Sequence, residues 1–260
     1  MFPIINIFGF KVASYGLINL IAFAVGIITA CFRAKKYEIS PEQEFLMLVH
    51  ALIGAIVGGK LLYLISKLGE IWDYKAIIFK NMNNFTAYME GGFVFYGGLI
   101  GGLTAAFMYC RYYKKPAIRM IEISVPSIPL MHGIGRIGCF MAGCCYGIPT
   151  KSKLSVIYTN SIAAPNGIPF FPVQLLEAGV NFILFILLMV YAKKWRKPYK
   201  MLGLYLVLYS IERFFLEFLR GDSIRGIYGG MSLSQWLSLF IVLPIGMLLF
   251  SSRHLKSKMQ

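Results

Sequence analysis

Charged residues are scarce in this sequence of 260 residues. Only 14% of the residues are Asp, Glu, Lys or Arg, whereas 58% are hydrophobic. A soluble globular domain carries roughly 25% charged residues. With so few charges the chain could not cover an ordinary water-exposed surface, so the composition excludes a soluble domain and indicates an integral membrane protein.

Acidic residues are the scarcest of the charged ones, and the chain has a formal net charge of +15. Such a charge can indicate nucleic-acid binding, but here Lys and Arg cluster at the ends of apolar runs, as is typical of membrane topology and contact with anionic lipid. We therefore expect membrane lipid, and no nucleic acid, as a partner. The first residues, MFPIINIFGF, lack a basic start and a cleavage site, so we expect no removable signal peptide.

Long apolar runs are abundant, and many approach the 20 or so residues that a helix needs to cross roughly 30 Å of hydrocarbon. We predict an all-α integral membrane protein, with residues 1–260 forming a single polytopic domain of about seven transmembrane helices. The predicted spans are about 12–32, 43–66, 92–110, 118–147, 172–192, 201–219 and 231–252. The fourth is long for one crossing, which a tilt, a break near Pro126 and Pro129, or a buried non-helical piece would each explain.

The basic residues also predict the orientation in the membrane. With seven spans, the loops that carry most of the Lys and Arg fall on one side, which the positive-inside rule places in the cytoplasm. The N-terminus is then outside and the C-terminus inside. The loops of about 67–91 and 148–171 fall on the other side, where we expect a small extracytoplasmic head. The second loop alternates in polarity, as a small strand pair would.

Ionisable residues inside apolar spans are the strongest sign of a functional site, because each costs roughly 2.5–3.5 kcal/mol at the bilayer centre. Arg213 and Glu217 are four residues apart and share one face of a helix. They either neutralise each other or form a polar cavity in which Glu217 orients Arg213 toward an anionic group, such as a phosphate. The candidates among the ionisable residues in the spans are Lys60, His132, Arg136, Glu177, Glu212, Arg213 and Glu217.

Arg136 lies in the segment 135-GRIGCFMAGCCYG-147, four residues after His132. On a continuous helix these two side chains face the same way. The neighbouring glycines, Gly133, Gly135 and Gly138, allow another backbone to approach closely, either for helix packing or for substrate binding.

Cysteine is infrequent, with five in the chain, and none forms a CxxC pair. This spacing does not predict a zinc site, and no nucleotide-binding pattern is present, so we expect no metal and no cofactor. Cys139, Cys144 and Cys145 then act as small buried hydrophobic residues. A redox or nucleophilic role for Cys144 or Cys145 stays open, because a nearby arginine favours the reactive thiolate.

Several motifs occur in a characteristic order: SYG at 14–16, GGK at 58–60, GGFVFYGGLIGG at 91–102, GRIGCFMAGCCYG at 135–147, FPVQLLE at 171–177, RFFLEFLRGD at 213–222 and SLSQ at 232–235. Together they resemble the prolipoprotein diacylglyceryl transferase family of the bacterial cytoplasmic membrane. The resemblance implies seven membrane helices, an outward N-terminus and a small extracytoplasmic head. It also implies transfer of diacylglyceryl from phosphatidylglycerol to the lipobox cysteine in a prolipoprotein signal peptide, with release of glycerol phosphate.

The resemblance also implies roles for particular residues. Arg136 and Arg213 match arginines that hold the lipid phosphate, and Tyr15 and Glu217 match other site positions. On this basis the catalytic candidates are Arg136, Arg213, Glu217, Tyr96 and His132. The substrate-binding candidates are Tyr15, Lys60, Gly97, Gly98, Gly138, Gln174, Glu177 and Arg220.

The sequence departs from the family pattern where the acceptor would be activated. The family's HGG is Tyr96-Gly97-Gly98, its GRxGNF has Cys139 in place of asparagine, a common acidic residue is Cys144, and a common arginine is Lys60. Either His132 or Tyr96 supplies the missing proton acceptor, or the enzyme uses phosphatidylglycerol with a different acceptor. A lipid-binding or transport protein without catalysis is the third hypothesis, but the paired repeats typical of transporters are not evident.

Overall fold

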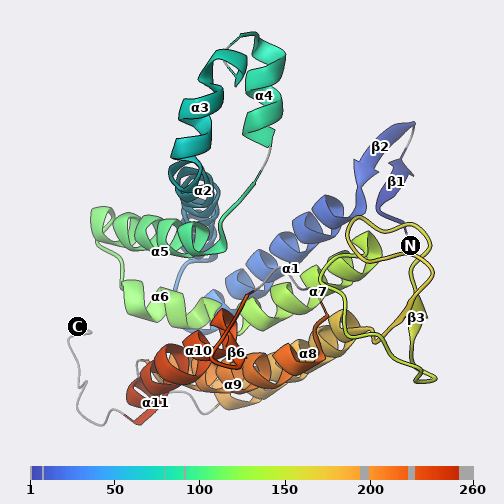
Figure 1. The fold of residues 1–260 in the computed structure, drawn as a ribbon. Helices are drawn as coiled ribbons and strands as arrows, with labels where there is room; N and C mark the ends of the chain where they lie inside the picture. The colour runs from blue at the N-terminus through green and yellow to red at the C-terminus, as the bar shows by residue number, and fades with distance from the viewer. Residues whose placement is uncertain are drawn as a thin grey trace. The chain divides into compact units, whose positions relative to one another are not determined.

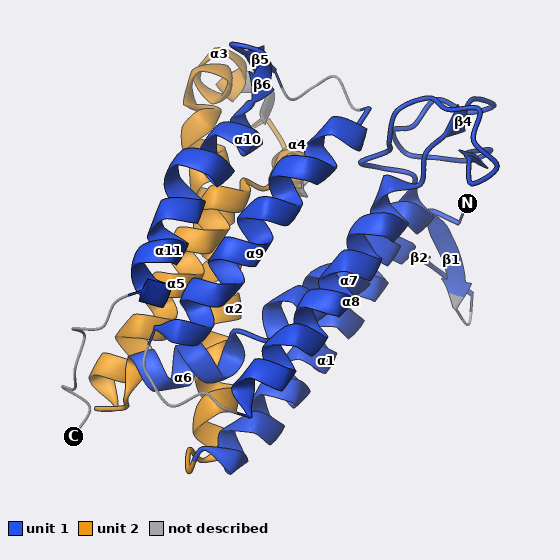
Figure 2. Ribbon diagram, turned by 90° about the horizontal axis from the view of Figure 1, so that it is seen from below, with its two compact units in different colours: residues 1–37, 118–260 blue, residues 38–117 orange. Residues whose placement is uncertain are grey.

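The computed structural model of the chain describes residues 2–7, 9–78, 80–90, 92–193, 199–221 and 226–251. Two residues of the motifs quoted above, Gly91 and Asp222, lie outside the described ranges. The same holds for some of the basic residues that predict the orientation, namely Lys194, Arg196, Lys197, Arg253, Lys256 and Lys258. The chain divides into two compact units, residues 1–37 with 118–260 and residues 38–117, coloured separately in Figure 2. The single domain over residues 1–260 therefore stays a prediction.

The first unit is built mainly of helices, some long enough to cross a membrane and others much shorter (Figure 1). In it α7 packs against both α1 and α8, and α9 packs against α8 and α11. A 3-10 turn, Glu217–Leu219, follows α9, and a π-helical turn, Ser238–Val242, joins the last two helices. The helices are α1 Ser14–Lys36, α6 Ala117–Ser124, α7 Ser127–Ala142, α8 Val173–Ala192, α9 Lys200–Leu216, α10 Leu233–Leu237 and α11 Leu243–Ser251.

The second unit is built on two helices whose backbones touch. A Cβ atom added to Gly97 would collide with the carbonyl oxygen of Gly58, and one added to Gly101 would collide with that of Gly54. Small residues at a crossing point are typical of packed membrane helices, because they let the two backbones approach. The helices of this unit are α2 Pro41–Ser66, α3 Leu68–Ile78, α4 Met82–Glu90 and α5 Phe95–Tyr112.

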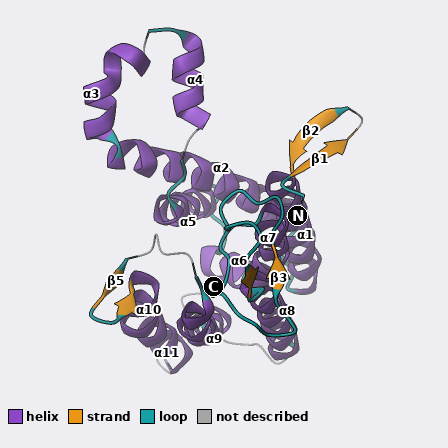
Figure 3. Cartoon of the chain, turned by 45° about the vertical axis from the view of Figure 1, so that its right-hand side comes forward, coloured by secondary structure: helices purple, strands orange, loops and turns teal. Residues whose placement is uncertain are grey.

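In the described part of the chain, three short antiparallel hairpins lie outside the helices (Figure 3). The strand pair predicted in the 148–171 loop is confirmed, with Val156 opposite Phe170. The other two hairpins were not predicted, because each strand is short and its alternation of polarity is weak. The strands are β1 Ile4–Ile7, β2 Phe10–Ala13, β3 Val156–Ile157, β4 Pro169–Phe170, β5 Ile227–Tyr228 and β6 Met231–Ser232.

Four helical segments of the described chain are long and apolar enough to cross a membrane: α1, α2, α8 and residues 233–251. They establish a helical membrane protein, while the count of seven spans stays a prediction. The long fourth span is broken, because α6 ends at Ser124 and α7 begins at Ser127. Pro126 lies in the break, where its missing N–H ends a helical hydrogen-bond ladder. Of the three explanations for its length, the break is therefore confirmed, and residues 143–147 at the end of the predicted span also form a non-helical piece that contains two glycines.

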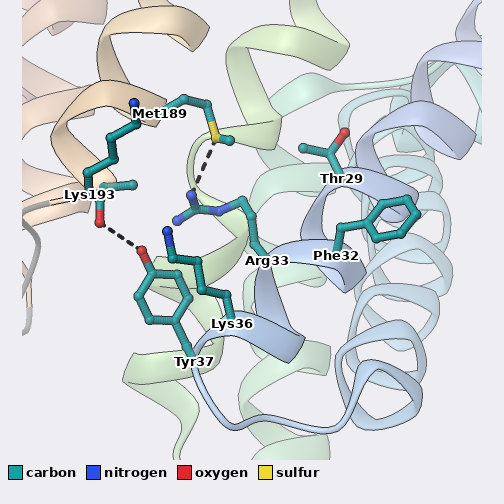
Figure 4. Close-up of a pocket in the computed structure, with 8 residues that line it drawn as sticks. Thr29, Phe32, Arg33, Lys36, Tyr37, Met189 and Lys193 are labelled. Atoms are coloured by element: carbon teal, nitrogen blue, oxygen red, sulfur yellow. Dashed lines mark hydrogen bonds between the residues drawn. The ribbon is translucent and has the colours of Figure 1, made fainter.

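A cavity of about 330 Å³ lies at the end of α1 next to the end of α8 (Figure 4). Arg33, Lys36 and Lys193 are among its lining residues. Arg33 is buried, and its Nε donates a hydrogen bond of 2.8 Å to the carbonyl oxygen of Ile123. The eight residues that line this cavity include none of the predicted site residues, which lie further along the same helices or on other elements.

Candidate active site

Arg136 of α7 points at a carboxylate of the neighbouring helix. Its Nη2 atom lies 2.8 Å from Oε1 of Glu177, a residue of α8 whose side chain is only 2% exposed. Its Nε atom donates a hydrogen bond of 3.2 Å to Nε2 of His132. The prediction that His132 and Arg136 share a helix face is confirmed, and their common partner is Glu177.

His132 has two competing contacts on one nitrogen. Its Nε2 accepts from Arg136 and also lies 3.4 Å from Oε1 of Glu177. Only a neutral ring with its proton on Nδ1 can accept the arginine's hydrogen bond, whereas an Nε2 that carries a proton can donate to the carboxylate. The two contacts of Nε2 are therefore alternatives, and which one forms depends on which ring nitrogen carries a proton.

Arg213 forms the second buried ion pair, at the end of α9. Its Nη2 atom lies 2.8 Å from Oε2 of Glu217, four residues along the chain, and donates a hydrogen bond of 3.2 Å to Oγ of Ser234. The predicted pairing on one face is confirmed. The Nη1 atom of Arg213 is buried and has no hydrogen-bond acceptor among the described residues. A buried donor of this kind is available to a bound anion.

Ser234 was missed as a site residue, although its motif was noted. It lies in the first turn of α10, where Ser232 and Gln235 form a capping box. Gln235 also donates from Nε2 to the carbonyl oxygen of Phe214 at 3.3 Å, which ties α10 to α9. The S-x-x-Q pattern predicts such a helix start. The position of Ser234 next to Arg213 follows only from the fold, not from this pattern.

Buried polar residues also link α8, which carries Glu177, to α9, which carries Arg213. Asn181 of α8 donates from Nδ2 to the backbone oxygen of Glu177 at 2.9 Å and to Oε1 of Glu212 on α9. Both arginines, Arg136 and Arg213, are within electrostatic range of Glu177 and Glu212. The polar groups of α7, α8 and α9 therefore form one cluster. Sequence reasoning missed Asn181, although a polar residue in an apolar helix is itself a signal of interhelical contact.

The cysteine-rich segment follows directly at the end of α7. Gly143 ends the helix in the left-handed region with φ of 72°, and Cys145 is also left-handed with φ of 56°. These turns bring the sulfur atoms of Cys139, Cys144 and Cys145 within 4.8 Å of one another. Tyr15, at the start of α1, is within electrostatic range of all three and of Arg136.

Gln174 of α8 holds the cysteine-rich segment through a hydrogen bond. It is fully buried, and its Nε2 donates to the carbonyl oxygen of Cys144 at 2.8 Å and to the hydroxyl of Tyr158 at 2.9 Å. Burial raises the pKa of the Tyr158 phenol, so the hydroxyl stays protonated and neutral. The structure therefore gives Gln174, predicted to bind substrate, a role in positioning the cysteine segment.

Arg220 is brought to the same region by its backbone. It forms a β-bridge with Gly147, and Ile148 N–H donates to the carbonyl oxygen of Leu219 at 3.0 Å. Arg220 is consequently within electrostatic range of Cys145. Gly147, the last residue of the GCCYG motif, has no room for a side chain, because a Cβ there would collide with the carbonyl oxygen of Phe171.

The glycines of α7 pack helices together. A Cβ at Gly138 would lie 3.3 Å from Cβ of Ile18 on α1, and one at Gly133 would lie 3.1 Å from the carbonyl oxygen of Ala178 on α8. Of the two explanations for these glycines, helix packing accounts for the described contacts. A further role of Gly138 in substrate binding stays a prediction.

The remaining predicted site residues belong to the second unit. Nζ of Lys60 lies 4.9 Å from the ring centroid of Tyr63, and the ring of Tyr96 meets that of Phe95 edge to face at 5.7 Å. Tyr96 is 46% exposed. Gly97 faces the backbone of α2, and Gly98 faces Phe93. These four residues belong to the second unit, whereas Arg136 and Arg213 belong to the first. Their part in the site therefore stays a prediction.

The fold and the cluster define a class: a polytopic helical membrane protein with two buried arginine–carboxylate pairs. The family model described as prolipoprotein diacylglyceryl transferase matches residues 3–251. The chain is 38% identical over 246 residues to the phosphatidylglycerol-prolipoprotein diacylglyceryl transferase of Clostridium tetani, with 95% of each chain covered. It is therefore a member of the prolipoprotein diacylglyceryl transferase family.

Two further relatives have similar names. The phosphatidylglycerol-prolipoprotein diacylglyceryl transferase 2 of Clostridium perfringens is 35% identical over 257 residues, covering 97% of this chain and 95% of the relative. The protein of that family name from Finegoldia magna is 32% identical over 240 residues, covering 92% and 90%. The chain thus matches these relatives over nearly their whole length.

Proposed function

We propose that this protein transfers the diacylglyceryl group of phosphatidylglycerol to the lipobox cysteine of prolipoproteins and releases glycerol phosphate. The observation that carries the proposal is Arg213, a buried guanidinium held by Glu217 and Ser234 whose Nη1 has no acceptor in the described part of the chain. A phosphate oxygen of the lipid would satisfy that donor. The names of the relatives supply the two substrates.

In this reaction negative charge develops on the departing phosphate, which Arg136 and Arg213 would hold. The acceptor sulfur attacks the glyceryl carbon that carries the phosphate ester, so a C–S bond forms while the C–O bond breaks. The bonding electrons leave with glycerol phosphate, and the thiol proton must pass to an acceptor. Fixed guanidinium groups of Arg136 and Arg213 stabilise the growing negative charge, and the apolar surroundings strengthen that stabilisation.

The carboxylates orient the arginines and neutralise them before the lipid binds. Glu177 and His132 position Arg136, as Glu217 and Ser234 position Arg213. His132 or Tyr96 serves as the proton acceptor in this account. The substrates would further contact Tyr15, Lys60, Gly97, Gly98, Gly138 and Arg220.

The proposed setting is the bacterial cytoplasmic membrane, which the chain crosses seven times with its N-terminus outside and its C-terminus in the cytoplasm. Arg136 lies near the end of α7 that continues into the 148–171 loop. If that loop belongs to an extracytoplasmic head, as we propose, the reaction occurs in the outer half of the bilayer.

The test uses purified protein, phosphatidylglycerol vesicles and two synthetic lipobox peptides that differ only in cysteine or serine at the acceptor position. We expect glycerol phosphate to be released with the cysteine peptide alone. Release that does not depend on the cysteine would favour the enzyme with a different acceptor. No release from folded protein with either peptide would contradict catalysis and favour a lipid-binding protein.

A further inference from the structure

Three thiols converge beside Arg136 of the proposed phosphate site, and the proposed transfer reaction does not use them. The sulfur atoms of Cys139, Cys144 and Cys145 lie within 4.8 Å of one another, and none of the three is in a disulfide bond. The linear spacing C-x4-C-C did not predict a zinc site, because it lacks a CxxC pair. In the fold, the left-handed residues Gly143 and Cys145 reverse the chain after α7 and bring the three sulfurs together.

The arrangement fits a three-coordinate protein site for zinc. A tetrahedral zinc ion with Zn–S bonds of about 2.3 Å separates its sulfur ligands by about 3.8 Å, so the sulfurs need to move by about 1 Å or less. Cys139 is buried, whereas Cys144 and Cys145 are partly exposed, so one side of the cluster is open. Gln174 holds the carbonyl of Cys144, which is the kind of outer support that orients metal ligands.

The charge of the surroundings also suits a metal-thiolate group. Three thiolates around Zn²⁺ carry a net charge of −1, which is costly in a membrane protein unless a cation is near. Arg136 and Arg220 are both within electrostatic range of Cys145. The site therefore provides compensation for the anionic complex, and thiolates select zinc over magnesium or calcium.

We propose that Cys139, Cys144 and Cys145 bind one zinc ion whose open fourth position takes the sulfur of the acceptor cysteine. This inference rests on the proposed transfer reaction. A zinc site with three protein ligands keeps one position open, and a coordinated thiol is deprotonated outright. The acceptor thiol releases its proton to water on binding. Its sulfur then forms the C–S bond as the C–O bond to glycerol phosphate breaks, with no change in the oxidation state of zinc.

The proposal gives a role to Cys139 and Cys144, two of the four departures from the family pattern. Where the family has histidine, asparagine and an acidic residue, this chain has Tyr96, Cys139 and Cys144. Two of the three replacements contribute sulfurs to the cluster. With zinc bound, water receives the thiol proton, so the general base that the proposed function assigns to His132 or Tyr96 is no longer required.

The first test measures the zinc content of purified full-length protein by elemental mass spectrometry. The protein is produced in medium with sufficient zinc. Wild type is expected to hold about one zinc ion per chain, as in a single-ion protein site. Cys139→Ser, Cys144→Ser and Cys145→Ser are each expected to lose most of it, whereas Cys31→Ser, on α1, retains it. Folded wild type without zinc, zinc retained by all three variants, or a protein mass showing a disulfide in the cluster would overturn the proposal.

The second test loads the protein with Co²⁺ and follows its sulfur-to-cobalt absorption while lipobox peptide is added. A cysteine peptide should strengthen the absorption as a fourth sulfur binds, and the matched serine peptide should not. Identical spectra with the two peptides would overturn the role of the fourth position.

Transfer activity separates this inference from the proposed function. Chelated protein should transfer at least about 100-fold more slowly, as expected when activation of a nucleophile is lost, and Zn²⁺ should restore the rate. Full transfer by chelated protein would overturn the zinc role and leave the transferase intact. Zinc binding and a peptide-dependent cobalt spectrum without any transfer would support the site while contradicting the transferase.

Discussion

Arg136 and Arg213 are held differently. Arg136 contacts both Glu177 and His132, whereas Arg213 contacts Glu217 and Ser234 and keeps Nη1 without an acceptor among the described residues. Arginine suits both positions, because its planar guanidinium can bind two phosphate oxygens at once and stays charged. Lysine offers a single point charge on a flexible stem.

The conservative substitutions Arg136→Lys and Arg213→Lys should each lower diacylglyceryl transfer by roughly 100-fold or more while the protein still inserts and folds, since loss of one preorganised charge donor costs about that much. Transfer rates in vesicles measure the effect. Arg111→Lys, at the exposed end of α5, is the matched control and should keep its rate. Full activity in either site variant would remove that arginine from the site.

The carboxylates should matter for stability. Glu177→Gln leaves Arg136 without its charged partner, and breaking a buried pair in this way costs about 3–5 kcal/mol. Thermal unfolding in detergent should show a clear fall in midpoint, with partial recovery on addition of phosphatidylglycerol, whose phosphate takes the place of the carboxylate. Glu70→Gln removes an exposed partner of Lys67 and should have little effect. An unchanged midpoint for Glu177→Gln would contradict the pairing.

Part of the site could be predicted from residues alone. Spacing of four placed His132 beside Arg136 and Arg213 beside Glu217, because helical periodicity fixes which residues are neighbours. The particular partners of Asn181 and Ser234 could not be predicted, since they depend on which helices pack together.

At the scale of elements, the apolar runs predicted most helices, and Pro126 marked the break between α6 and α7. The helices α3 and α4 lie in a segment predicted only as a loop, because its mixed polarity has no clear period. The convergence of Cys139, Cys144 and Cys145 could not be predicted from the sequence either. It depends on left-handed backbone at Cys145 and on support from Gln174, thirty residues away.

The contact between α2 and α5 gives a prediction of its own. Gly101→Ala places a methyl group against the carbonyl oxygen of Gly54, so we expect a loss of about 1–3 kcal/mol from overpacking. Gly179→Ala on α8 is the control, because its Cβ would meet nothing within 4 Å. Detergent unfolding of both variants measures the difference. Equal stability would contradict the close helix crossing.

At the scale of the whole molecule, the orientation in the membrane can be tested by labelling. Lys153→Cys, in the proposed extracytoplasmic loop, should react with a membrane-impermeant thiol reagent in intact cells. Lys114→Cys, after α5 on the predicted cytoplasmic side, should react only after permeabilisation. Wild-type protein supplies the background from native cysteines. Labelling of position 114 in intact cells, with position 153 protected, would reverse the proposed topology.

The most direct measurement is tandem mass spectrometry of a lipobox peptide after incubation with the purified protein and phosphatidylglycerol of one defined acyl composition. The account predicts a diacylglyceryl mass on the peptide cysteine, formed by wild type and absent with a variant carrying both Arg136→Ala and Arg213→Ala. An unmodified peptide with folded wild-type protein, or an adduct formed equally by the double variant, would contradict it.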